Sequence, residues 1–209
     1  MKKSARTLGA LAGAAVLIAG ASAVATAETT GPPADHGHHD YGRTAVRSGI
    51  PATARTFTVT SPDVRDGGRI PASAWADSFG CTGGNQQIRL NWSGAPRKAR
   101  GFAVSMQDTD ATTGSGFWHW MAWDIPASQK SLGRTLPAGV VSGTNDGGTR
   151  GYLGPCPPAG DIAHRYKITV YALDTPSLKL DASSTPAVAA STMSRHIIGY
   201  GRITATAQQ

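Results

Sequence analysis

The sequence predicts an all-β fold that carries one C-terminal helix and a few short helical turns. Apolar and polar residues alternate in three segments, Phe102–Asp108, Trp118–Asp124 and Tyr166–Ala172, which is the pattern of a half-buried strand. The 209 residues include 26 glycines and 13 prolines but only 16% charged residues, a composition that favours many tight turns. This length is sufficient for one domain with a substantial core.

Residues 1–27 have the three parts of a secretory signal peptide. A basic start that ends at Arg6 precedes an apolar stretch over residues 8–24, and Ala25-Thr26-Ala27 predicts cleavage after Ala27. A transmembrane anchor is the competing interpretation, which the cleavage site and the lack of another apolar run of about 18 residues disfavour. We therefore expect a secreted, extracellular protein with no integral membrane segment after cleavage.

Residues 28–55 lack hydrophobic periodicity and contain several prolines and glycines, so we expect a flexible N-terminal extension before a domain over residues 56–209. His36, His38 and His39 lie between two aspartates in this extension and could bind Zn²⁺, Cu²⁺ or Ni²⁺. We favour a polar tail, because a flexible segment imposes no coordination geometry. No metal site or cofactor is therefore predicted.

The formal net charge is +7, and three of these charges belong to the signal segment. The remaining excess of basic residues is mild and not clustered. A nucleic-acid binder carries a basic stripe with interleaved aromatic residues, which this sequence lacks. Nucleic acid is therefore not an expected partner.

The segment Gly101–Ile125 predicts a β-hairpin. Its first strand ends near Asp108, and residues 110–116 have the glycine, aspartate and threonine content of a turn. Because antiparallel strands joined by a turn meet at one end, we expect Asp108 and His119 at the same end of the sheet. Strict alternation places His119 on the face of Met121.

A proline-rich loop over residues 151–163 leads into the third long strand. Pro157 and Pro158 stiffen this loop, because proline fixes φ and lacks an N–H donor. The loop therefore delivers His164 and Tyr166 to the start of the strand, where Tyr166 keeps the parity of the apolar residues that follow. A hairpin loop followed by two core residues is the simpler alternative.

Shorter alternating patterns predict the remaining strands. They cover Phe57–Thr60, Ile88–Trp92, a short edge strand at Leu178–Leu180 and a last strand at Arg202–Ala207. Between the last two, Ser184-Thr185-Pro186 predicts a helix start, because a hydroxyl can cap the helix and proline fits its first position. The helix is expected to carry an apolar stripe of Ala189, Met193 and Ile197 and to end near Gly199.

Four short motifs follow one another along the chain. They are Asp108-Thr-Asp110-Ala-Thr, Gly116-Phe-Trp-His119-Trp120, Gly154-Pro-Cys-Pro-Pro158 and His164-Arg165-Tyr166. In order and spacing, over roughly residues 55–205, they resemble the phosphatidylethanolamine-binding protein family in its bacterial Raf-kinase-inhibitor-like branch. Thr109 and Thr112 stand where the family pattern has prolines, which loosens the rim of the expected site.

The resemblance implies a two-sheet antiparallel β-sandwich over residues 56–209 and a non-enzymatic binding protein with a small pocket for an anion such as phosphate. The matching pocket positions are Asp108, His119, Tyr166, Pro157 and Pro158, with Asp110 and His164 around them. Histidine, tyrosine and loop N–H groups can donate to an anion's oxygens. Asp108 would hold His119 in a donor tautomer or accept from a hydroxyl or ammonium group, which suits a zwitterionic phospholipid headgroup.

Each residue of this set has a structural alternative. Asp110 could cap the turn, His164 could pin the loop, and Tyr166 could be a core tyrosine bonded to a backbone carbonyl. Two other functions stay open: a hydrolase that uses Asp108, Asp110 and His119 for acid–base chemistry, and a carbohydrate-binding β-sandwich with exposed tryptophans. No catalytic residue is assigned, because no activated nucleophile can be read from the sequence.

The resemblance also implies protein partners, since family members act as kinase or protease inhibitors. An intracellular kinase does not suit an exported protein, whereas proteases share the extracellular space. The expected partners are therefore a small anionic or zwitterionic ligand and a protein target, protease or kinase.

Cys81 and Cys156 are the two cysteines of the chain. In an exported protein, two cysteines in loops most often form a disulfide. The rival interpretation is Cys156 as a nucleophile, because it lies a few residues before His164. We favour the disulfide, since no cysteine-hydrolase signature accompanies Cys156.

Overall fold

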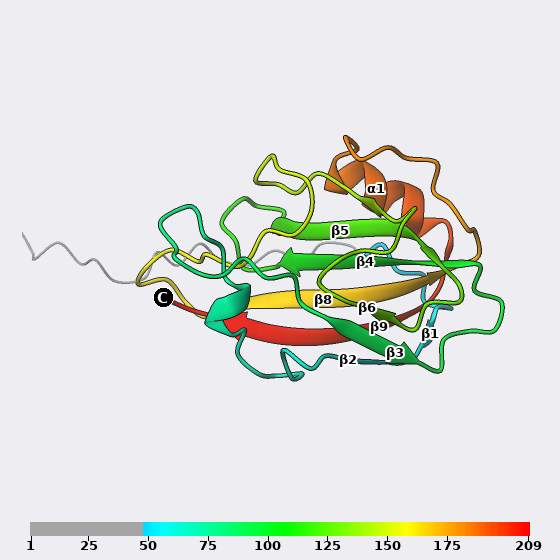
Figure 1. The fold of residues 1–209 in the computed structure, drawn as a ribbon, viewed down its shortest axis with the longest axis horizontal. Coiled ribbons are helices and arrows are strands. Elements are labelled where there is room, and N and C mark those ends of the chain that lie inside the picture. The colour runs from blue at the N-terminus through cyan, green and yellow to red at the C-terminus, as the bar shows by residue number, and fades with distance from the viewer. Residues whose placement is uncertain (1–47) are drawn as a thin grey trace, which may run out of the picture. The chain divides into compact units, whose positions relative to one another are not determined.

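The computed structural model describes residues 48–209, which form two β-sheets, one α-helix and one short 3₁₀ helix (Figure 1). The large sheet has the spatial order β1-β9-β8-β4-β5-β7. Its strands are β1 (Arg55–Thr56), β4 (Gly101–Asp108), β5 (Phe117–Pro126), β7 (Val141–Ser142), β8 (His164–Leu173) and β9 (Ile197–Ala207). The small sheet has the order β2-β3-β6 and contains β2 (Thr58–Thr60), β3 (Leu90–Ser93) and β6 (Ser131–Leu132).

The predicted signal peptide and cleavage site, and the histidines His36, His38 and His39, lie outside the described residues. Within the described range, no helix combines the length and the hydropathy of a membrane span.

The main hydrophobic core lies between the two sheets. Ile168 and Val170 of β8 and Phe102 of β4 project from the inner face of the large sheet and are buried. They belong to one cluster with Leu90 and Trp92 of the small sheet. The alternating apolar side chains of β8 therefore share one face, as the sequence predicted. Their burial stabilises the packing of the two sheets against each other.

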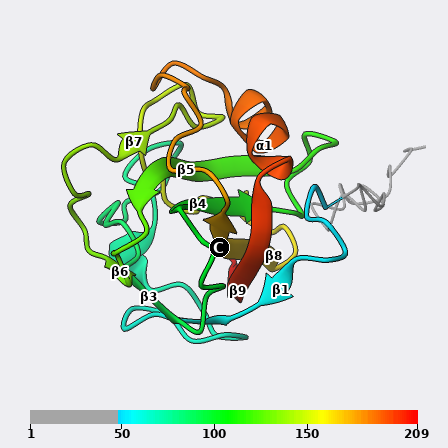
Figure 2. The ribbon, with the colours of Figure 1, turned by 90° about the vertical axis from the view of Figure 1, so that its right-hand side faces the viewer.

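A second core covers part of the outer face of the large sheet, where α1 (Pro186–Ser194) packs (Figure 2). The helix begins as predicted: the Thr185 hydroxyl accepts from the Val188 N–H, and Pro186 occupies the first turn. Ala189 and Met193 are buried against Met121 and its neighbours. The helix therefore covers the outer face of the sheet near the end that lies away from the predicted site.

The two-sheet β-sandwich is confirmed, but four local predictions were wrong. The helix ends at Ser194, so Ile197 lies in β9, because it pairs with Leu173. The last strand therefore starts at Ile197 and not at Arg202. Leu178 lies in no strand, since its N–H donates to Asp124 Oδ1 at 2.8 Å. The sheet is not wholly antiparallel, because β1 pairs with β9 in parallel.

Candidate functional site

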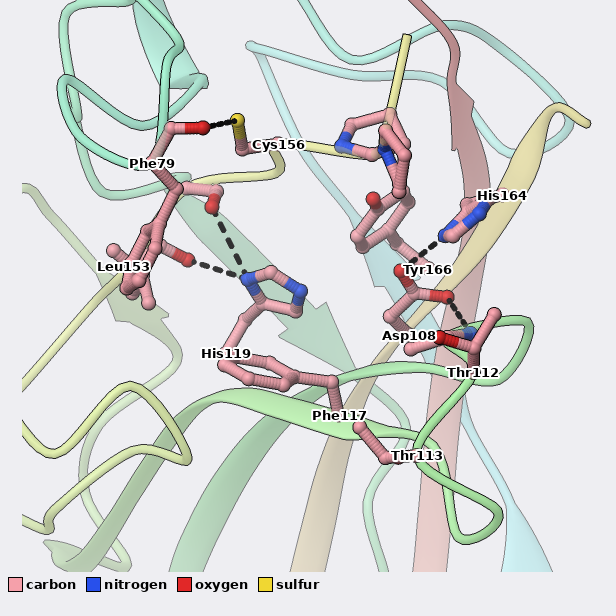
Figure 3. Close-up of a pocket in the computed structure, with 14 residues that line it drawn as sticks. Phe79, Asp108, Thr112, Thr113, Phe117, His119, Leu153, Cys156, His164 and Tyr166 are labelled. Atoms are coloured by element: carbon pink, nitrogen blue, oxygen red, sulfur yellow. Dashed lines mark hydrogen bonds and ion pairs between the residues drawn. The ribbon is translucent and has the colours of Figure 1, made fainter. Parts of the chain in front are cut away.

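A pocket of about 240 Å³ opens at the end of the large sheet where β4 ends and β8 begins (Figure 3). Asp108 of β4 is directly paired with Phe117 of β5 and with Tyr166 of β8, so the three strands bring their side chains together. The remaining wall comes from the loops that follow β4 and precede β8 and from the loop before β3, which carries Phe79. The lining residues are Phe79, Asp108, Ala111, Thr112, Thr113, Phe117, His119, Leu153, Gly154, Cys156, Pro157, Pro158, His164 and Tyr166.

The predicted site residues thus gather at one place, with one exception. Asp108, His119, Tyr166, His164 and the two prolines all line the pocket, but Asp110 does not. The sequence did not single out Phe79, Phe117 or Leu153. The hairpin register could have located Phe117, because it is the residue opposite Asp108.

A β-bulge turns His119 into this pocket. The register of β4 and β5 shifts between Met106 and Gln107, so one extra residue, His119, lies between Trp118 and Trp120 on β5. The His119 ring then packs against Tyr166, with ring centroids 5.2 Å apart. The predicted face of His119 was therefore wrong: Met121 lies in the outer core, whereas His119 points to the inner side.

Two backbone carbonyls fix the tautomer of His119. Its Nδ1 lies 3.0 Å from the Leu153 oxygen and 3.1 Å from the Gly154 oxygen, and because a carbonyl can only accept, Nδ1 carries the proton. Burial lowers the pKa of His119, and the nearby charges of Asp108 and Asp146 raise it less. The lowered pKa favours the neutral ring, whose unprotonated Nε2 lies on the pocket side.

Gly154 makes this geometry possible. A Cβ at this position would meet the Ala74 oxygen and the Ala76 nitrogen at 2.3 Å, so only glycine lets the loop approach the 3₁₀ segment Ala72–Ala74 so closely. The Gly154 N–H also donates to Asn85 Oδ1 at 2.8 Å. The loop is thereby held with its carbonyls directed at the His119 ring.

Asp108 pairs with His164, not with His119. The Asp108 Oδ2 atom accepts from His164 Nδ1 at 2.7 Å, and Oδ1 accepts from the N–H groups of Asp110 and Ala111 at 2.9 and 3.1 Å. The expected role of Asp108, to orient His119, was therefore wrong. Its carboxylate closes the turn after β4 and anchors the start of β8.

His164 lies between two carboxylates. Its Nε2 atom lies 3.1 Å from Asp161 Oδ2, on the ring edge opposite Asp108. Burial lowers the pKa of His164, but the hydrogen bonds and charges of Asp108 and Asp161 more than offset this effect, so the pKa is raised. Both ring nitrogens face carboxylate acceptors, so the protonated form suits this position.

Asp110 faces away from the pocket, toward Arg165. Its Oδ2 accepts from the backbone N–H and the Nε of Arg165 at 2.9 and 2.8 Å, and its Oδ1 accepts from the second guanidinium arm at 2.7 Å. This bidentate ion pair ties the turn after β4 to the start of β8. Asp110 thus supports the pocket wall from behind.

Tyr166 carries an unpaired donor at the floor of the pocket. Its side chain is fully buried, and its hydroxyl has no hydrogen-bond partner among the described residues. Burial raises the pKa of Tyr166 most, and the nearby Asp108 carboxylate raises it further. The Tyr166 hydroxyl and Asp108 nevertheless form no hydrogen bond of normal geometry. A buried unpaired hydroxyl costs about 1–3 kcal/mol, which a bound acceptor would recover.

A disulfide joins Cys81 and Cys156 across 75 residues, as the sequence suggested. Cys156 is therefore not a free thiol, and the alternative in which it acts as a nucleophile was wrong. The bridge links the loop that carries Phe79 to the loop that carries Pro157. Phe79 is 71% exposed and forms an apolar rim at the mouth of the pocket.

Comparison with known proteins gives matches to one family. The family described as Phosphatidylethanolamine-binding protein matches residues 60–208. The protein YbcL of Escherichia coli is 40% identical over 161 residues, which cover 73% of this chain and 88% of YbcL, and YbhB of the same organism is 34% identical over 152 residues, or 69% and 96%.

A solved structure shows the same fold. The crystal structure of E. coli YbcL, described as a new member of the mammalian PEBP family, superposes with a TM-score of 0.71 at 38% identity and covers 73% of this chain and 98% of that one. The family match over residues 60–208 includes the three strands that carry the pocket, β4, β5 and β8. The chain therefore belongs to the phosphatidylethanolamine-binding protein family.

Proposed function

We propose that this chain is an exported, non-enzymatic binding protein that takes a small phosphate-bearing ligand, such as a phospholipid headgroup, in the pocket beside His119 and Tyr166. The unpaired Tyr166 hydroxyl supports this proposal most directly. Three buried side-chain donors lack a hydrogen-bond partner among the described residues, and of these three residues, Trp92, Trp120 and Tyr166, only Tyr166 lines the pocket. The adjacent His119 Nε2 offers a second polar contact within the same pocket.

The arrangement of carboxylates argues against the hydrolase alternative. Asp110 does not line the pocket, and Asp108 is engaged by His164 and two backbone N–H groups. A general base needs a carboxylate or imidazole within reach of the proton it removes, next to a nucleophile that can be activated. Asp108 and Asp110 are thus both held in ion pairs, with His164 and Arg165, an arrangement that suits binding better than catalysis.

The burial of the tryptophans argues against a carbohydrate-binding surface. Trp92, Trp120 and Trp123 are buried, and Trp75 and Trp118 pack partly against the cores. Within residues 48–209, the large apolar side chains that are exposed are Phe79, Ile162 and Val188. A flat tryptophan platform is therefore not formed by the described residues.

Export is part of the proposal and is supported by two observations. The first is the signal-peptide pattern over residues 1–27, and the second is a relative from Mycobacterium tuberculosis, 36% identical over 165 residues, named "Putative lipoprotein LppC". Inhibition of an extracellular protease stays a prediction from the family resemblance alone.

Calorimetric titration with phosphoethanolamine and with inorganic phosphate tests the proposal. His119→Asn is the main variant, because the Asn amide can still donate to the Leu153 and Gly154 carbonyls but has no counterpart of Nε2. The matched control is His196→Asn, which removes an exposed histidine bonded to Asp174 outside the pocket. We expect His119→Asn to weaken binding about 10- to 150-fold and the control to leave it unchanged. No binding to the wild type, or equal loss in both variants, contradicts the proposal.

A further inference from the structure

The outer face of the large sheet is covered only in part. α1 and the core beneath it lie over Ala103, Tyr171 and Tyr200, at the end away from the pocket (Figure 2). Closer to the pocket, the alternation continues on β8 and β9, so that Ile168 and Ile203 face the inner core and their neighbours face outward. Five of these outward residues are exposed or half-exposed: Arg165, Lys167, Arg202, Thr204 and Thr206. This part of the sheet is therefore an open surface within the described residues.

Four basic side chains gather on this open surface, although they are far apart in the sequence. Arg165 and Lys167 stand two positions apart on β8, and Lys167 and Arg202 are diagonal neighbours across the pairing of β8 with β9. Arg69 forms an isolated parallel bridge with Thr206, which lies directly opposite Arg165. The sequence predicted basic residues that are not clustered, and the sheet brings these four together. We call them the basic face: Arg69, Arg165, Lys167 and Arg202.

Positive charge exceeds negative charge on the basic face. Arg165 is bound by Asp110, and the carboxylate of Asp66 accepts from a backbone N–H of β9 at the edge of the sheet, at 2.8 Å. Within residues 48–209, neither Lys167 nor Arg202 forms an ion pair. Burial lowers the pKa of Lys167 most, and the nearby charges of Arg202 and Arg165 lower it further. Four cations thus face two carboxylates, which leaves positive charge without a partner in this part of the chain.

The arginines of the basic face are held in place before any partner binds. The Nε of Arg202 donates to the Thr169 hydroxyl at 2.8 Å, and its guanidinium lies 5.5 Å from the centroid of the Tyr200 ring. Arg165 is fixed by its two bonds to Asp110. An ordered arginine loses little conformational entropy on binding, and its planar group matches the geometry of a carboxylate.

We propose that the basic face is a docking surface for an acidic protein, whose carboxylates pair with Arg69, Lys167 and Arg202. Charge complementarity requires an anionic partner. The composition favours a protein, because arginine and tyrosine are enriched in protein interfaces. None of the four cations lines the pocket, so this surface is separate from the proposed ligand site.

An anionic membrane is the competing partner, and the apolar side chains disfavour it. Binding to a lipid surface combines positive charge with apolar side chains that enter the bilayer. Within residues 48–209, the exposed large apolar side chains are Phe79, Ile162 and Val188, and none of them belongs to a strand of the large sheet. The basic face therefore offers charge and hydrogen bonds but no residue that would insert.

Binding of labelled poly-L-glutamate to the full chain, followed by fluorescence anisotropy, tests this inference. The double variant Lys167→Gln, Arg202→Gln is expected to weaken binding about 2- to 30-fold, because two exposed ion pairs are lost. The matched control is Arg97→Gln, Lys98→Gln, which removes the same charge from the exposed turn before β4 and is expected to leave binding unchanged. Binding to the wild type should weaken as ionic strength rises from about 0.1 to about 1 M, since the screening length falls from about 10 to about 3 Å.

A second measurement locates the contact without any variant. On addition of poly-L-glutamate, the amide NMR signals of Lys167, Thr204 and Thr206 are expected to shift, and those of Arg97 and Lys98 to stay. Shifts spread over the whole surface, equal weakening in both double variants, or no binding to the wild type at about 0.1 M ionic strength would refute the docking surface. If vesicles that contain phosphatidylglycerol require Lys167 and Arg202 whereas poly-L-glutamate does not, the partner is a membrane and the proposal of an acidic protein is wrong.

Discussion

Replacing Tyr166 with phenylalanine is expected to stabilise the free protein and to weaken ligand binding. The substitution removes only the hydroxyl, which is buried and has no hydrogen-bond partner among the described residues. The ring stays, and with it the contact to His119 at 5.2 Å. The desolvation cost of an unpaired polar group is about 1–3 kcal/mol, so the free energy of unfolding is expected to rise by up to that amount.

The melting temperature gives the assay. For a chain of this size, about 1 kcal/mol corresponds to about 2–4 °C, so Tyr166→Phe is expected to melt at least about 2 °C higher in phosphate-free buffer. Binding of a phosphomonoester should weaken about 10- to 150-fold, because the lost bond has a charged acceptor. Opposite changes in stability and affinity are typical of a residue kept for function.

Tyr171→Phe is the matched control on the same strand. The Tyr171 hydroxyl lies 3.0 Å from the Ser105 hydroxyl in the outer core, so its removal leaves a buried partner unpaired. We expect this variant to lose about 1 kcal/mol and to bind phosphate normally. If Tyr166→Phe instead loses stability as Tyr171→Phe does, its hydroxyl has a structural partner, and the interpretation of Tyr166 as a ligand residue is refuted.

Three further substitutions or treatments test the surroundings of the pocket. His164→Gln is expected to destabilise the protein most at acid pH, because two carboxylates raise the pKa of His164 in the folded state. The stabilisation that protonated His164 gives is complete below the unfolded pKa of about 6.5 and is lost as pH rises through the folded pKa. Denaturant titrations that show the same difference in unfolding free energy at every pH would contradict this. Reduction of the Cys81–Cys156 disulfide should lower the free energy of unfolding by roughly 4 kcal/mol and weaken phosphate binding, whereas a Cys81→Ala, Cys156→Ala double variant should not respond to reductant. Gly154→Ala should weaken binding, because a Cβ would meet the Ala74 oxygen at 2.3 Å and displace the carbonyls on His119; unchanged affinity by calorimetry would show that the loop adjusts freely.

The sequence predicted the strands better than the direction of the functional side chains. Alternation along β8 placed Tyr166 correctly, because that strand pairs with β4 without a register shift at this point. Strict alternation predicted the wrong face for His119, because a β-bulge adds one residue to β5 and reverses the direction of the side chains beyond it. The bulge depends on pairing with β4, which is not encoded in the local pattern of β5.

The partners of the titratable groups were also beyond the sequence. The Asp108–His164 pair joins residues 56 positions apart, and the carbonyls that orient His119 come from a loop 34 and 35 residues further on. Hydrogen-bond geometry of this kind follows from tertiary packing rather than from residue type or spacing. Residue identity was therefore enough to nominate the pocket, but not to assign a donor or an acceptor to each member.

The position of β9 has a consequence for the order in which the fold can form. β9 follows every other element in the chain, yet it lies between β8 and β1 inside the large sheet and is the strand with which β1 pairs. The earliest strand of the sheet therefore has no partner until the latest one has been synthesised. Such long-range pairing slows folding, so β4, β5 and β8 can pair early, whereas the edge of the sheet at β1 cannot form until the last strand has been synthesised.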